Sequence, residues 1–200
     1  QIMRAVFDFV HEGKREEGLR RLRDAMKTHP DDEELEGVLA DLTLLAGDPE
    51  AGERFQHLAQ RGPEGTGQVL VETNRLKHAY LLLRQAGGRA AMPVVEQAEN
   101  SAQKAIRAGD ETFSPRIELA AVHALRGNRQ KALEWLELAY AAGARDYRAL
   151  EIDPFFEELR VDPRFREILE RMANDVAQMR ERAREQLPEI FLPRQQTDVP

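Results

Sequence analysis

The sequence lacks several features on which common protein functions depend. It contains no cysteine, which excludes disulfide bonds, thiolate nucleophiles and thiolate metal sites. Its formal net charge is -7, which argues against a nucleic-acid module, because such modules normally present a basic face. No apolar run approaches the roughly 20 residues that a membrane-spanning helix needs, so we expect no membrane insertion. Sustained alternation of β-branched and polar residues is also absent, so we expect no sheet.

Groups that could carry catalysis are equally scarce. Ser101 and Ser114 are the only serines, and no predicted strand precedes either one, as a nucleophile elbow would require. The histidines are scattered one to each predicted helical region and match no metal-ligand spacing: His11, His29, His57, His78 and His123. We therefore expect a protein that is not an enzyme and that needs no cofactor or metal.

Two short segments superficially suggest ligand sites. Residues 62–67, GPEGTG, resemble a phosphate loop, but no strand precedes them and no lysine follows, so we interpret them as a connecting loop. The acidic run 31–34 suggests a cation site. Acids also complement the dipole of a helix in its first turn, and we favour that interpretation.

What the sequence has in abundance is helix-forming residues: alanine, leucine, glutamate and arginine. The clearest pattern is RIELAAVHALRGNRQKALEWLELAYAAGAR, residues 116–145. Apolar residues recur there at helical spacing, Gly127 interrupts them, and a second helical stripe follows. Small residues on these stripes would let two helices approach closely, and the large residues would fill the space between neighbours.

The same arrangement recurs near the N-terminus with a period of 34 residues. A first predicted helix ends at Gly13, and a second ends at His29-Pro30. A step of 34 residues carries three small residues onto identical ones: Gly13 to Gly47, Gly18 to Gly52, and Ala25 to Ala59. A third copy is distorted, with a long first helix expected over 69–85, an insertion near residues 88–93, and a second helix over 93–108.

The chain then departs from this pattern. Asp153-Pro154 precedes the aromatic pair Phe155-Phe156, for which we favour packing in a terminal core over a binding role. Asp162-Pro163 is a good helix start, because an aspartate cap precedes a preset proline backbone. A long helix to about Gln186 should then bury one apolar face, made of Phe165, Ile168, Leu169, Met172, Val176 and Met179.

These features resemble the tetratricopeptide repeat, whose length is 34 residues. The segment LEWLELAYAAGARDYRALEIDPFFEELRVDPRFREILERM is similar to the C-terminal end of arrays in bacterial multidomain regulatory proteins. The resemblance implies an all-α, right-handed superhelical solenoid of about four helix pairs and a long C-terminal capping helix. It divides the chain into repeats at about 1–31, 32–65, 66–110 and 111–145, capping helices at 146–186, and a proline-containing tail at 187–200. At His123 the family usually has an aromatic ring, so we expect that histidine to pack in the core.

Solenoids of this kind bind partners on a concave face lined by the first helix of each pair. The register places the following groove candidates on that face: Asn74, Lys77, His78, Leu81, Arg84, Ile117 and Ala121. Asn74, Lys77 and Arg84 form a cluster of donors that could hold a carboxylate or a peptide backbone. An ordinary solvated face is the alternative.

We therefore predict a non-enzymatic scaffold that binds a protein or peptide. The alternative is the regulatory or dimerising segment of a larger bacterial signalling enzyme or transcription factor, whose active domain lies upstream of Gln1. A homodimer through the terminal helix or the tail is a further prediction, and Ile190 to Leu192 either dock on the array or stay free. We expect a cytoplasmic location with the periplasm as the alternative, because the absence of cysteine is compatible with both compartments. The chain begins inside a predicted helix, so the sequence leaves open whether targeting information lies upstream of Gln1.

Overall fold

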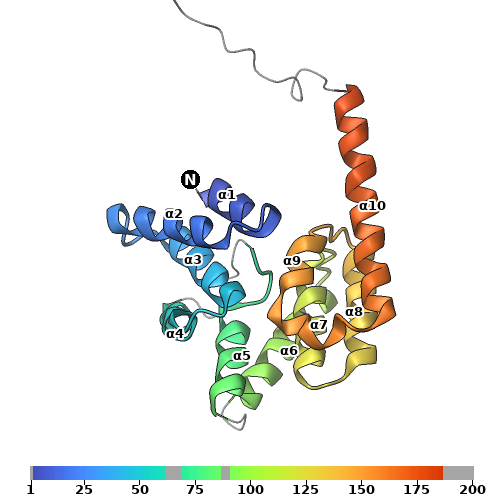
Figure 1. The fold of residues 1–200 in the computed structure, drawn as a ribbon. Coiled ribbons are helices and arrows are strands. Elements are labelled where there is room, and N and C mark those ends of the chain that lie inside the picture. The colour runs from blue at the N-terminus through green and yellow to red at the C-terminus, as the bar shows by residue number, and fades with distance from the viewer. Residues whose placement is uncertain (1, 62–68, 87–90, 187–200) are drawn as a thin grey trace, which may run out of the picture.

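The structure, a computed structural model, describes residues 2–61, 69–86 and 91–186. Within these ranges it contains α-helices, one π-helical turn and one 3-10 helix, and no strand. Figure 1 shows the helices stacked in sequence order, with the last helix projecting from the body. The predicted all-α fold is confirmed. The loop at 62–67, the first part of the predicted insertion (88–90) and the tail at 187–200 lie outside the described residues.

Four helix pairs precede a C-terminal ending of different design. The pairs are α1 (Ile2–Val6) and its continuation η1 (Phe7–His11) with α2 (Arg15–Thr28), α3 (Glu33–Ala46) with α4 (Glu50–Arg61), α5 (Asn74–Ala86) with α6 (Met92–Arg107), and α7 (Ser114–Leu125) with α8 (Arg129–Ala141). The ending consists of α9 (Tyr147–Ile152), η2 (Pro154–Leu159) and α10 (Pro163–Gln186).

Glycines make the turns and the closest contact in the first two pairs. Gly47 ends α3 with a φ of 70°, a left-handed backbone that side chains disfavour. Gly18 serves packing instead, because a Cβ added there would lie 2.8 Å from the Ala5 carbonyl oxygen and 2.9 Å from the Phe9 Cβ. The absence of a side chain at Gly18 therefore lets α2 lie directly against the first helix.

The acidic run before α3 is part of a helix start, as predicted. The Asp32 carboxylate accepts a hydrogen bond of 3.0 Å from the Leu35 N–H, and Glu33 and Glu34 occupy the first turn. This arrangement satisfies one free amide of the helix end and places negative charge at its positive pole.

The prediction for the final helix is correct in its bounds and partly wrong in its buried face. Phe165, Ile168, Leu169 and Met172 are buried, whereas Met179 is 53% exposed. Figure 1 shows the reason: the C-terminal half of α10 extends past α8 and α9, so no other described helix packs against it.

The predicted start of the third pair is also wrong. Residues 69–73 are not helical, and α5 begins only at Asn74. The backbone N–H groups of Val69 and Leu70 donate to the Asp41 carboxylate at 3.2 and 3.0 Å, so they bind a side chain of α3 instead of a preceding helical turn. We call residues 69–73 the linking segment.

Candidate partner-binding cleft

The first helices of the pairs, α1–η1, α3, α5 and α7, form one side of the array, which we call the inner side. Part of that side is covered by α9 and η2, which together we call the cap (residues 147–159). The Phe155 ring lies 4.8 Å, centroid to centroid, from the Tyr80 ring of α5. At the other end of the array, the Arg148 Nη1 donates to the His11 carbonyl oxygen at 2.6 Å. The cap therefore joins the last part of the chain to the first helix.

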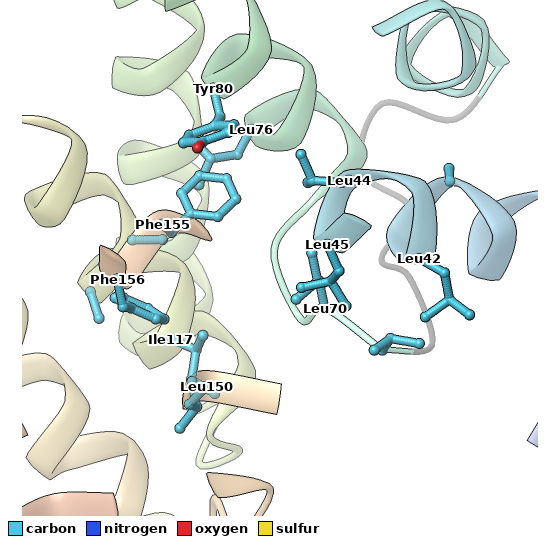
Figure 2. Close-up of a cluster of buried hydrophobic side chains, with 14 of the residues drawn as sticks. Leu42, Leu44, Leu45, Leu70, Leu76, Tyr80, Ile117, Leu150, Phe155 and Phe156 are labelled. Carbon is cyan, nitrogen blue, oxygen red and sulfur yellow. The ribbon is translucent and has the colours of Figure 1, made fainter. Parts of the chain in front are cut away.

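The linking segment fills more of the inner side. Figure 2 shows Leu70 pointing toward Leu45 of α3, and Phe155 beneath Tyr80 and Leu76 of α5. Leu70 and Phe155 are 2% and 4% exposed. The linking segment and the cap thus cover much of the inner side, which is the surface on which we expected a partner to bind.

An open cleft of about 540 Å³ remains between the cap and the helices α2 to α5. Its lining includes Leu44 from the end of α3, Tyr80 and Leu81 from α5, and Pro154 from η2. Charged side chains of both signs lie among these apolar groups, including Arg15, Arg84, Arg160, Glu151 and Glu157. The cleft combines apolar side chains with charges of both signs, as protein-binding surfaces do.

The arginines of the cleft have different local partners. Arg84 is 63% exposed, lies over the Tyr80 ring at 5.9 Å and stands 3.5 Å from a Glu157 oxygen. Arg160 donates to the Asp153 carbonyl oxygen at 3.1 Å. An exposed ion pair such as Arg84–Glu157 is weak, so a partner's carboxylate or backbone can compete for the guanidinium.

Three of the seven groove candidates remain reachable, or partly so. Leu81 and Arg84 line the cleft. His78 is half-buried, and burial lowers the pKa of its imidazole, so the ring is neutral near pH 7.

The other four candidates are buried, so the prediction of an accessible donor cluster is wrong. Ile117 and Ala121 are 3% and 0% exposed, and Asn74 is 7% exposed. Lys77 is 0% exposed, and its Nζ donates to Asp41 at 2.8 Å and to the Leu70 carbonyl oxygen at 3.0 Å. The inward register was correct for Lys77, but the inner side is filled by the chain itself.

The binding roles of two acids that organise this filled side were not predicted from the sequence. Asp41 binds the linking segment from α3. Glu118 binds it from α7, where its two carboxylate oxygens accept from the Thr73 N–H at 2.9 Å and the Thr73 hydroxyl at 2.8 Å. The available signal was an acid inside an apolar helical run, as in VLADLTLL around Asp41 and IELAAV around Glu118.

Two further acids meet between the linking segment and the cap. Glu72 and Asp153 are 0% and 2% exposed, and their carboxyl groups lie within hydrogen-bonding reach of each other. Burial raises the pKa of Asp153 to about 7, and burial together with the neighbouring Asp153 charge raises the pKa of Glu72 well above its usual range. Asp153 also accepts a hydrogen bond of 2.9 Å from the Phe155 N–H, which begins η2.

Two further predictions concern the packing of His123 and the possibility of a metal site. His123 is 6% exposed on α7, as expected for a core position. Among the described residues, no group of three or more histidine, aspartate or glutamate side chains is arranged to hold a metal ion. Within the same residues, no helix is both long and apolar enough to cross a membrane.

Comparison with solved structures shows which fold this is. The chain is similar to a thermophilic TPR (tetratricopeptide repeat) protein of Thermus thermophilus, with 22% identity and a TM-score of 0.54 over 90% of this chain and 94% of that one. The structure of MamA aligns with 16% identity and a TM-score of 0.38 over 85% of this chain and 93% of that one, which is too low to argue from. No family model and no curated protein matches the sequence. The chain therefore has the predicted TPR-type solenoid fold.

Proposed function

We propose that the protein is a non-enzymatic scaffold whose open cleft binds a peptide segment of another protein. The observation that carries the proposal is the cleft itself, which stays open although the cap and the linking segment fill much of the inner side. Its lining combines the apolar Leu81 with the exposed Arg84, both from one helix. A cleft lined by apolar side chains and by charges of both signs suits a peptide better than a nucleic acid, for which one sign of charge would dominate.

The test selects a ligand and then removes the cleft. A displayed library of random peptides is enriched on the natural chain, and the Kd of an enriched peptide is measured by calorimetry. Leu81→Asp and Arg84→Glu should each weaken its binding at least about tenfold, the equivalent of about 1.4 kcal/mol. Arg107→Glu is the matched control, because Arg107 is an exposed arginine on α6 that does not line the cleft.

Two results would count against the proposal. One is that no peptide is enriched above the background of the bare support. The other is an enriched peptide whose affinity falls as much with Arg107→Glu as with the two cleft variants, which would place the binding surface elsewhere.

A further inference from the structure

The inner side holds a compact group of ionisable side chains from every element that meets there. Asp41 comes from α3, Lys77 from α5, Glu118 from α7, Glu72 from the linking segment and Asp153 from the start of η2. All five residues are at most 4% exposed. Four carboxyl groups thus surround one ammonium, an excess of negative charge that is costly away from water.

The hydrogen bonds of this group account for two of the carboxylates. Asp41 accepts from Lys77 and from two backbone amides of the linking segment. Glu118 accepts from the amide and the hydroxyl of Thr73. The Lys77 ammonium divides its described bonds between Asp41 and the Leu70 carbonyl oxygen, so it donates to neither Glu72 nor Asp153.

Glu72 receives no hydrogen bond from another residue in the part of the chain that the structure describes. Both of its carboxylate oxygens are buried and have no hydrogen-bond partner as long as the neighbouring Asp153 is counted as an acceptor alone. Two ionised carboxylates in contact would repel each other, whereas one added proton converts the contact into a hydrogen bond. The burial of both acids and the unpartnered Glu72 oxygens therefore favour a proton between the linking segment and the cap.

We propose that Glu72 and Asp153 form a proton-binding site that fastens the cap to the linking segment, and that loss of this proton loosens the cap from the inner side. Asp153 links the proton site to the cap, because its carboxylate also accepts a hydrogen bond from the Phe155 N–H at the start of η2. Pro154 and Glu157 of the same helix line the cleft, so loosening the cap changes the cleft's wall.

The direction of the pH dependence follows from the two raised pKa values. In the closed form the pKa of Asp153 is about 7 and that of Glu72 is above its usual range, whereas both approach ordinary values near about 4 when the cap opens into water. Between about pH 4 and pH 7, opening of the cap releases protons. The protons therefore stabilise the closed cap fully below about pH 4, and this stabilisation is lost as pH rises through about 7.

Other charged groups near the site do not supply the missing proton. Arg160 contacts the Asp153 main-chain oxygen, and the Tyr80 hydroxyl has a raised pKa, chiefly through burial. Arg145 and Asp146 line a small cavity beside Asp153, but the first pairs with Asp175 at 3.1 Å and the second caps α9.

The experiment measures hydrogen-exchange protection factors of the full chain at pH 5.5 and 7.5. In the natural protein, protection of the amides at 69–73 and 155–159 should fall by roughly tenfold per pH unit for each proton released. Glu72→Gln, which supplies a permanent donor, should make that protection nearly independent of pH. The matched control is Glu158→Gln, an exposed glutamate of η2, which should keep the dependence of the natural chain.

The proposal is overturned if the natural chain protects these amides equally at both pH values, or if Glu72→Gln leaves the dependence as steep. Should Glu72→Gln fail to fold, a carboxyl ¹³C titration of the natural chain decides. Two carboxyl carbons with midpoints above pH 6 support the site, and midpoints all below pH 5 contradict it. Neither measurement involves a peptide ligand, so the result does not depend on the proposed function.

Discussion

Two helix contacts of the array, one within the fourth pair and one between the second and third pairs, are held together by different chemistry. In α7 and α8 the facing residues are apolar and fully buried, among them Ala120, Ala132 and Leu136. Between α3 and α5 the central contact is the buried ion pair of Asp41 with Lys77, flanked by the linking segment. Apolar packing tolerates many partners, whereas a buried charge requires a particular one, so the second contact specifies a single arrangement.

The largest effect is expected from breaking the ion pair. Lys77→Met removes the ammonium and leaves the Asp41 charge buried, which should lower the free energy of unfolding by about 3–5 kcal/mol. Denaturant unfolding followed by circular dichroism measures the change.

The matched control for this effect is the double variant Asp41→Asn, Lys77→Met, which removes both charges of the ion pair itself and leaves the other buried acids in place. It should recover part of the stability lost in Lys77→Met. If the loss in the double variant equals the sum of the losses in Asp41→Asn and Lys77→Met, the two residues are not coupled. That result would remove the contrast with the fourth helix pair.

In the fourth pair the corresponding test is a cavity. Leu136→Ala removes a fully buried side chain from α8 and should cost about 2–5 kcal/mol in the free energy of unfolding. Because no titratable group contributes to this loss, it should be the same at pH 5.5 and 7.5. A loss that changes by more than about 1 kcal/mol between the two values would mean that the apolar pair is coupled to the carboxyl cluster.

A smaller effect separates steric from conformational roles of glycine. Gly18→Ala places a Cβ within 3 Å of the first helix and should destabilise the protein by about 1–3 kcal/mol. Gly37→Ala, in the middle of α3, meets nothing within 4 Å and should stabilise it by about 0.5–1 kcal/mol. Thermal unfolding of both variants checks the pair, and equal signs would contradict the packing of α2 on the first helix.

The smallest effect is expected at the cleft. Arg84 and Glu157 are 63% and 55% exposed, so Arg84→Gln should change stability by less than about 1 kcal/mol. Urea unfolding gives the value. A larger loss would mean that Arg84 is a structural residue of the cap contact and would weaken its assignment to partner binding.

The regular part of this fold was predictable because it depends on spacing alone. Small and large residues at helical intervals, interrupted by Gly47 or Gly127, determine helix pairs whatever lies around them. The capping helix was predictable as far as Met172 for the same reason. How far α10 outruns its neighbours depends on the positions of α8 and α9, which the apolar stripe alone does not encode.

The inner side was harder to predict because its contacts join residues far apart in sequence. The register correctly turned Lys77 inward, but an inward residue on a solenoid is normally solvated. The linking segment occupies this space because Asp41 binds two of its amides and Glu118 binds Thr73. Asp41 and Leu70 are 29 residues apart in the sequence, and Thr73 and Glu118 are 45 residues apart. Arg84 and Leu81, near the end of α5, are not covered by the linking segment, and they line the cleft.

The most direct test of this account is whether the cap sits on the inner side in solution. Nuclear Overhauser contacts between the aromatic protons of Tyr80 and Phe155 report it, since the two ring centroids lie 4.8 Å apart. At pH 5.5 the account predicts strong cross-peaks between the two rings. Their absence in a sample that retains the contacts between α7 and α8 would contradict a cap seated on the inner side.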